Sequence, residues 1–188
     1  PGNKVIHNLD STSKDFFYSG VSLANGDVLL SSQSKFLRAS ILENDRLDVQ
    51  PLMSSSDLSS SFSMYLDQQG RLWLNDNLQS FLILDTVCFE PIASLPMNVL
   101  AYNLIESKDG RTIWVSTSTG LFKINAVDLK IETRYDHKQG LPRSSLTAME
   151  MDNDGRIWLA YNKGILMFDP VTNYCRMYNE DDGLSPNE

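Results

Sequence analysis

The sequence contains few of the features that mark membrane-spanning or disulfide-bonded proteins. Its apolar runs are short: the segments 81–84 and 165–168 have four residues each, whereas a transmembrane helix needs about 18 or more. Two cysteines among 188 residues exclude a disulfide-dense miniprotein, although they do not decide the redox compartment. We therefore expect a fold stabilised by a hydrophobic core, which a chain of this length can bury.

Basic residues are also scarce. The chain has 16 Lys and Arg against 24 Asp and Glu, a formal net charge of −8. Affinity for nucleic acid comes largely from clustered Lys and Arg, so this composition predicts no nucleic-acid partner. No signal peptide is present, but the chain begins Pro1-Gly2-Asn3 and not with Met. We interpret it as a processed or excised segment, so the missing signal does not indicate a cytoplasmic location.

What the sequence does contain is a repeat around its three tryptophans. The segments Gly70-Arg71-Leu72-Trp73, Gly110-Arg111-Thr112-Ile113-Trp114 and Gly155-Arg156-Ile157-Trp158 align, the second with one extra residue. A weaker copy at 26–30 has Leu29 in place of Trp. Because every tryptophan falls on this one position, we infer a true internal repeat of about 40–45 residues.

Each repeat is expected to form four short strands, because apolar and polar residues alternate over short segments bounded by turn residues. Sustained helical periodicity is lacking, so helix should be nearly absent. The expected strands are 17–23, 28–32, 36–41 and 47–52 in the first unit, 99–105, 112–116, 121–125 and 131–135 in the third, and 145–151, 156–161, 165–168 and 174–178 in the fourth.

Four-stranded antiparallel units at this period are typical of a β-propeller. A β-sandwich also uses short strands, but it gives no reason for the recurring Trp, which in a blade packs between neighbouring sheets. We predict blades at about 16–57, 58–96, 97–141 and 142–179, with 1–15 and 180–188 belonging to flanking blades. This all-β segment would be part of a larger seven- or eight-bladed propeller. The serine-rich stretch 54–61 is interpreted as a connection between blades and not as a domain linker.

Two further motifs recur. Blades end in segments such as Ser94-Leu95-Pro96-Met97-Asn98 and Gly140-Leu141-Pro142, and strand two leads into turns such as Thr117-Ser118-Thr119-Gly120-Leu121. Together with Gly-Arg before each Trp, these motifs resemble the two-component regulator propeller repeat, whose pattern is roughly GLPxN, DxxGxxW and a Thr-x-x-Gly-Leu turn. The resemblance covers residues 60–188, is close in blades three and four, and is poor in blade one.

The resemblance implies a function that spacing alone does not. Such propellers form the periplasmic sensor region of membrane-anchored signalling proteins, especially hybrid histidine kinases by which Bacteroides-type bacteria detect glycan fragments. It implies a non-catalytic segment that senses or relays binding of an oligosaccharide, a homodimer in the full-length protein, and membrane attachment only through regions outside this segment. The remaining blades of the propeller would be its nearest partners, and no cofactor is implied.

Polar turn residues are the candidate ligand-binding groups. In a propeller the turns between strands two and three share a face with the blade-to-blade connections, and we call this face the rim. Polar groups there suit a saccharide, although an ordinary solvated loop face is the alternative. The rim candidates for ligand binding are Asn75, Asn77, Arg143, Tyr161, Asn162 and Lys163.

The other chemically suggestive residues receive structural interpretations. Asp152-Asn153-Asp154-Gly155 resembles the start of a calcium loop, but Tyr161 stands where the bidentate Glu belongs, so a hairpin turn is expected and no metal site. His7 and His137 have no partners at ligand or catalytic spacing. Aromatic strand residues other than Tyr161 are expected to pack in the core, namely Tyr102, Trp114, Tyr135, Trp158 and Tyr174.

The two cysteines are expected to be separate thiols. Cys88 and Cys175 follow their blade tryptophans by 15 and 17 residues, which places both near fourth strands. Because those strands lie two blades apart, the cysteines would exceed the roughly 7 Å Cα separation that a disulfide allows.

Two alternative functions stay open at this point. The segment could belong to a propeller enzyme, a lyase or hydrolase, for which the rim offers only Asp76 and Lys163 as acid and base. It could instead be a protein-interaction propeller, which an exposed apolar rim patch would indicate.

Overall fold

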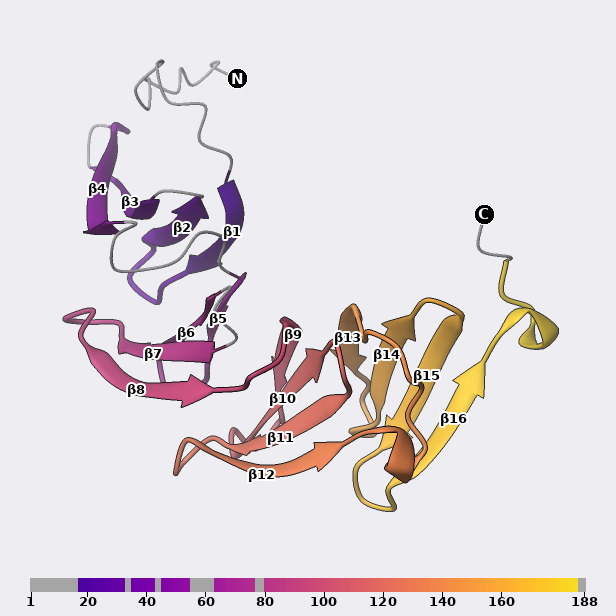
Figure 1. Cartoon of the computed structure of the whole chain (residues 1–188). Helices are drawn as coiled ribbons and strands as arrows, with labels where there is room; N and C mark the ends of the chain where they lie inside the picture. Colours follow the sequence, from indigo (N-terminus) through magenta and orange to yellow (C-terminus); the bar gives the residue numbers. More distant parts are fainter. Residues whose placement is uncertain (1–16, 33–34, 43–44, 55–62, 77–79, 186–188) are drawn as a thin grey trace.

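The chain folds into antiparallel β-sheets, as seen in a computed structural model that describes residues 17–32, 35–42, 45–54, 63–76 and 80–185. Four sheets of four strands each are hydrogen-bonded in chain order, which confirms the expected all-β propeller blades. The sheets follow one another along an arc, with the first strand of each blade on the concave side and the fourth on the convex side (Figure 1).

The strands are short, as the repeat predicts. They are β1 (Phe17–Ser22), β2 (Val28–Ser32), β3 (Lys35–Ile41) and β4 (Leu47–Ser54) in blade one; β5 (Ser63–Leu66), β6 (Arg71–Asp76), β7 (Ser80–Asp85) and β8 (Pro91–Pro96) in blade two; β9 (Ala101–Glu106), β10 (Thr112–Thr117), β11 (Leu121–Asn125) and β12 (Lys130–Tyr135) in blade three; and β13 (Ala148–Met151), β14 (Ile157–Tyr161), β15 (Gly164–Asp169) and β16 (Tyr174–Tyr178) in blade four.

Helix is confined, in the described part of the chain, to two single 3₁₀ turns. These are η1 (His137–Gln139) and η2 (Glu180–Asp182), each of which follows the fourth strand of its blade and carries a capping box. No helix among the described residues is both long and apolar enough to cross a membrane.

The expected strand limits agree well with the structure, except at the start of blade four. The strand expected at 145–151 begins only at Ala148. Its first residues take another role, because the main-chain N–H of Leu146 donates to the carbonyl of Thr117 in blade three (3.0 Å). Interpretations that fall on 1–15, on 55–61 and on 186–188 lie outside the described residues.

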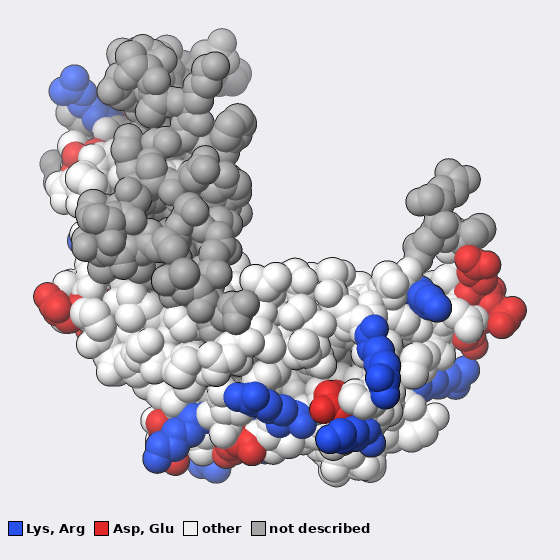
Figure 2. Space-filling model, in the orientation of Figure 1, with Lys and Arg blue, Asp and Glu red and all other residues white. Residues whose placement is uncertain are grey.

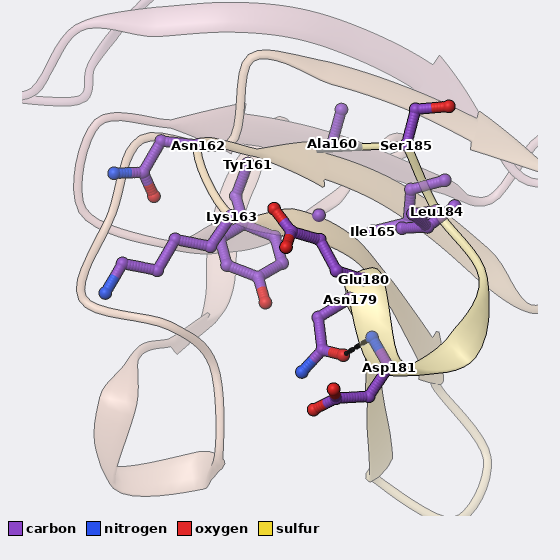
Figure 3. A pocket seen from close by; sticks show the side chains of 11 residues that line it. Ala160, Tyr161, Asn162, Lys163, Ile165, Asn179, Glu180, Asp181, Leu184 and Ser185 are labelled. Atoms are coloured by element: carbon purple, nitrogen blue, oxygen red, sulfur yellow. Dashed lines mark hydrogen bonds between the residues drawn. The ribbon is translucent and has the colours of Figure 1, made fainter. Parts of the chain in front are cut away.

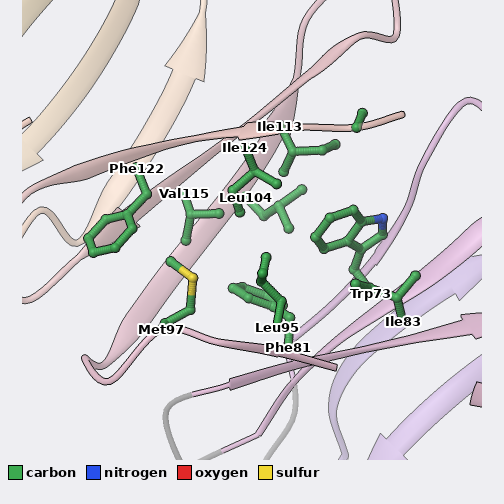
Figure 4. Close-up of a cluster of buried hydrophobic side chains, with 11 residues drawn as sticks. Trp73, Phe81, Ile83, Leu95, Met97, Leu104, Ile113, Val115, Phe122 and Ile124 are labelled. Carbon is green, nitrogen blue, oxygen red and sulfur yellow. The ribbon is translucent and has the colours of Figure 1, made fainter. Parts of the chain in front are cut away.

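The hydrophobic core is divided among the blade junctions, as expected for a propeller. Trp73 is fully buried between blades two and three, and Trp114 is 3% exposed between blades three and four. Figure 4 shows the Trp73 ring beside side chains of blade three, including Ile113 and Leu104. Leu29, which replaces Trp in blade one, is fully buried against blade two. The repeat position therefore faces the following blade.

Trp158 differs from the other two tryptophans because no described blade lies on its far side. Its ring is only half-buried and stacks on Tyr178 of its own blade, with ring centroids 5.7 Å apart. The expectation that Tyr102 and Tyr174 pack in the core is also wrong. Tyr102 is 37% exposed and Tyr174 is 56% exposed. Both lie on outermost strands of their sheets, one facing the concave side and the other the convex side.

Tyr65 on β5 provides a test of the junction between blades two and three. Burial raises the pKa of Tyr65 to about 12, and the nearby negative charge of Glu106 adds to the effect. The stabilisation from neutral Tyr65 is present below the unfolded pKa of about 10 and is lost as the pH rises toward 12. We expect one of the seven tyrosines to ionise late in a titration followed at 295 nm.

The control is the Tyr65→Phe variant, which should lack this late phase while keeping the others. Unfolding in urea should likewise move the late phase down to the ordinary tyrosine range. A folded wild-type protein whose tyrosine absorbance is complete by pH 11 would contradict the assignment.

Candidate functional site

The rim is formed where the turn after the second strand meets the connection into the next blade. The amide nitrogen of Asn75 donates to the carbonyl of Ala101 at the start of blade three (2.8 Å). In blade four, the Ser144 hydroxyl, on the connection into that blade, donates to the amide oxygen of Asn162 in the turn of the same blade (2.8 Å). The structure thus brings turn and connection residues together on one face, and the Asn75 bond joins two neighbouring blades.

The Thr-x-x-Gly turn of blade three shows why that motif recurs. The Thr117 hydroxyl is buried, donates to the carbonyl of Gly120 (2.8 Å) and accepts the main-chain N–H of the same glycine (3.1 Å). Gly120 has φ 149°, and a Cβ there would overlap the main-chain carbonyl oxygen of Tyr135. The turn therefore needs Gly, and it fixes Ser118, whose N–H donates to Leu100 (2.9 Å).

Blade four carries a hollow on the rim, with a volume of about 710 Å³. Tyr161, Asn162 and Lys163 from the β14–β15 turn form one side, and Glu180 and Asp181 of η2 form another (Figure 3). The N–H of Asp181 is held by the Asn179 side chain at 2.8 Å. The hollow thus combines an aromatic ring, two side-chain amides, one ammonium group and two carboxylates within one opening.

The same position in blade three is filled by the chain itself. There the segment after η1 runs across the sheet, with Leu141 3% exposed and Leu146 fully buried. In blade four the counterpart Leu184 is only half-buried and lines the hollow. Part of this hollow is therefore the place that a following blade-to-blade connection would occupy.

The five rim candidates that the structure describes do not form one compact site. Tyr161, Asn162 and Lys163 lie together at the hollow of blade four, whereas Asn75 lies two blades away in blade two. Arg143 is exposed on the connection between blades three and four. Asn77 lies outside the described residues.

Charged side chains of both signs lie near the described rim, although acidic residues follow one another on η2 (Glu180–Asp182). Lys163 is accompanied by Glu180 and Asp181, and basic and acidic groups are interspersed along the outer edge of the face seen in Figure 2. The arrangement offers hydrogen-bond donors and acceptors together with an aromatic ring. It therefore suits a polar, hydroxyl-rich ligand better than a highly charged one.

In the described part of the chain, no group of three His, Cys, Asp or Glu side chains is placed so that it could hold a metal ion. His137 belongs to η1, with Nδ1 3.6 Å from the Asp136 carboxylate. Cys88 and Cys175 are both free thiols, as expected. Both lie near fourth strands, as expected: Cys88 is in the turn that leads into β8, and Cys175 is on β16. Asp85 caps the turn of Cys88 by accepting the N–H of Val87 (2.7 Å).

The most consequential residues that sequence reasoning missed are two aspartates beneath the repeated tryptophans. One carboxylate oxygen of Asp67 accepts the indole N–H of Trp73 (2.8 Å) and the Nε–H of Arg71 (2.7 Å), and the other accepts the main-chain N–H of Arg71 (2.8 Å). We call this arrangement the Asp–Arg–Trp cluster. The available signal was an Asp six residues before the Trp.

Blade four contains the same cluster. Asp152 accepts the Trp158 indole N–H (2.9 Å) and the Nε–H of Arg156 (2.8 Å). The Trp158 hydrogen bond, followed by the bonds from Arg156, holds the pKa of Asp152 well below its usual range. The hairpin expected at 152–155 is confirmed, since Met151 and Ile157 pair across it, and its carboxylate is occupied by these neighbours.

Comparison with known proteins gives neighbours in structure but none in sequence: no family model and no curated protein matches the chain. The extracellular domain of BT3049 from B. thetaiotaomicron, assigned as a hybrid two-component system, matches 96% of this chain with TM-score 0.78 and 16% identity. That of BT4673 from the same organism, also assigned as a hybrid two-component system, matches 92% with TM-score 0.75 and 19% identity. The chain spans about a quarter of the length of each, 25% and 26%.

A propeller enzyme is also among the similar structures. Virginiamycin B lyase from Staphylococcus aureus, in a catalytically inactive form with quinupristin, matches 90% of this chain and 57% of its own length, with TM-score 0.68 and 14% identity. At these identities the likenesses establish the fold alone. The chain is a β-propeller segment that shares its architecture with extracellular domains of Bacteroides two-component systems.

Proposed function

We propose that this chain is a non-catalytic arc of the extracytoplasmic, periplasmic sensor propeller of a hybrid two-component histidine kinase. The observation that carries the proposal is the match of nearly the whole chain to two such ectodomains. The share of their length that it spans is consistent with further blades from the same protein. Kinase, membrane anchor and homodimer contacts would lie outside this segment.

The ligand class that best fits the rim is an oligosaccharide. Tyr161 offers a half-exposed ring for stacking on a sugar face, and Asn162 and Lys163 stand beside it in the same hollow. The ligand would occupy the part of the hollow that the following connection leaves open. Asn75 and Arg143 would serve a ligand, or a neighbouring module, that extends along the arc. Binding would signal by shifting the population between two arrangements of the dimer, which requires different affinities for the two.

Calorimetric titration of the full ectodomain against neutral and acidic oligosaccharides tests this proposal. We expect at least one to bind, and Tyr161→Ala to weaken it about tenfold, the equivalent of one lost stacking contact. Tyr174→Ala, on the exposed convex strand β16, is the matched control and should bind as wild type. If none of the oligosaccharides binds, the proposed ligand-binding function is wrong and the arc has a purely structural role.

A lyase is the second candidate, favoured by the likeness to virginiamycin B lyase. Incubation of the ectodomain with quinupristin, followed by mass spectrometry, separates the two. Our proposal predicts that quinupristin keeps both its chromatographic retention time and its mass, and conversion into any new product would replace sensing with catalysis.

A protein-interaction function has some support from exposed valines. Val87, Val127 and Val171 lie in the turns between third and fourth strands and are 88%, 66% and 91% exposed. These turns lie on the face opposite the rim, at one position per blade, and they do not form the apolar rim patch that would favour this function.

A further inference from the structure

Blade three departs from the Asp–Arg–Trp cluster of its two neighbours. Its hairpin closes with the same two main-chain hydrogen bonds. In blade three, the N–H of Ser107 donates to the carbonyl of Thr112 (2.8 Å), and the N–H of Gly110 donates to the carbonyl of Ser107 (2.9 Å). In blade two, the N–H of Asp67 donates to the carbonyl of Arg71 (3.0 Å), and the N–H of Gly70 donates to the carbonyl of Asp67 (2.9 Å). Ser107 therefore takes the place of Asp, and Thr112 takes the place of Arg. The extra residue of this repeat is accommodated within the turn.

Ser107 reproduces only half of the missing carboxylate. Its hydroxyl oxygen accepts the main-chain N–H of Thr112 (3.0 Å), as the first carboxylate oxygen of Asp67 accepts that of Arg71. The second carboxylate oxygen, which in blades two and four accepts the indole N–H, has no counterpart. Among the described residues none accepts the N–H of Trp114, although this side chain is 97% buried, being 3% exposed. The indole nitrogen itself is not enclosed, because it is not among the described buried side-chain nitrogens that lack a partner, so its N–H can donate to a ligand in the hollow.

A hollow of about 380 Å³ lies where these groups are missing, on the face opposite the rim at the junction of blades three and four. Ser107, Thr112 and Trp114 all line it, which are the three positions of the cluster. This volume falls in the lower part of the range of small-molecule pockets, and it is large enough for a ligand the size of a monosaccharide.

Two lysines supply positive charge around the hollow. Lys108 and Lys123 line it; the Lys108 ammonium donates to the carbonyl of Asn153 (2.6 Å), and that of Lys123 lies 3.0 Å from Glu132. Each ammonium has three N–H donors, so both keep hydrogen-bonding capacity.

Two acidic residues also line the hollow, and both are engaged by their own surroundings. Asp109 accepts the Ser107 hydroxyl (2.6 Å) and the main-chain N–H of Arg111 (3.1 Å). Asp154 accepts from Nη2 of Arg156 (2.6 Å). Their charge is partly satisfied, whereas the Trp114 N–H has no described acceptor.

We propose that this hollow binds a small carboxylate, whose oxygen replaces the missing aspartate and accepts the Trp114 N–H, with Lys108 and Lys123 supplying positive charge. The site rests on the comparison between blades and does not depend on ligand binding at the rim.

Indole ¹H–¹⁵N spectra of the 188-residue chain test the site, because the three tryptophans give three N–H signals and Trp114→Phe identifies one. Addition of sodium glucuronate should move the Trp114 signal saturably and leave those of Trp73 and Trp158 in place. Glucose, the matched neutral sugar, and sodium chloride at equal ionic strength should not move it. No movement with glucuronate, or equal movement with either control, would overturn the proposal.

Variants distinguish binding of glucuronate in the hollow from a non-specific effect of glucuronate on the Trp114 signal. Ser107→Asp supplies the acceptor from the chain itself and should abolish the titration. Lys123→Gln should weaken glucuronate several-fold, whereas Lys130→Gln, on the same blade but not lining the hollow, should leave its affinity unchanged. If Ser107→Asp does not fold, the comparison of Lys123→Gln with Lys130→Gln tests the site. Equal affinities of these two variants for glucuronate would exclude it.

Discussion

Replacing Asp67 with alanine is expected to lower the free energy of unfolding by about 3–5 kcal/mol, the usual result of removing one partner of a buried ion pair. The Asp67 carboxylate is buried, and it satisfies both the fully buried Trp73 indole and the Arg71 guanidinium. Arg71 has a second nitrogen, Nη2, that is already buried without a hydrogen-bond partner among the described residues. Without Asp67, Arg71 would lose its ion pair at the blade junction and keep the longer-range attraction of Glu106 in blade three.

The matched variant is Asp152→Ala in blade four. It removes the same hydrogen bonds, but Trp158 is half-buried and Arg156 is open to solvent, so water can replace the lost partner. Its loss should be clearly smaller than that of Asp67→Ala in urea unfolding followed by circular dichroism. Equal losses at the two positions would show that burial between blades does not set the strength of the cluster.

The Gly120→Ala variant is expected to lose about 2–3 kcal/mol of stability, because two effects act together. Alanine is strained at φ 149°, and its Cβ would overlap the main-chain carbonyl of Tyr135 at the end of β12. Either β12 moves away from β11 or the turn opens, and Thr117 then loses its hydrogen bonds to Gly120.

The control for steric overlap is Gly155→Ala. Gly155 also has positive φ, at 83°, but a Cβ there meets no atom within 4 Å. This substitution should cost only the backbone strain, about 1 kcal/mol. If both variants unfold at the same urea concentration, then the carbonyl contact at Gly120 contributes nothing.

The sequence predicted those features that depend on local periodicity. Strands β2, β11 and β16 have the expected limits, and the tryptophan position lies at blade junctions, because alternation and the repeat directly report which side is buried. Leu146 was misplaced because its N–H bonds to a different blade, a contact that no local pattern records.

The candidate site was less predictable than the fold. The turn Tyr161-Asn162-Lys163 was found from the turn pattern, but the acidic η2 residues that share its hollow come from the end of the same blade. Similarly, the missing carboxylate beneath Trp114 is visible in sequence only once the function of Asp67 is known. Contacts between particular side chains on different strands are found only in the three-dimensional structure, whereas the positions of the strands can be predicted from the sequence.

The central claim is that these blades are an arc of a larger sensor propeller, so that a further blade covers Trp158. Hydroxyl-radical footprinting of the 188-residue chain and of the full ectodomain measures this directly, with oxidation of each tryptophan read by mass spectrometry. We predict that Trp158 oxidises fastest of the three in the chain and falls to the rate of buried Trp73 in the ectodomain. An unchanged high rate of Trp158 oxidation in the ectodomain would contradict the claim.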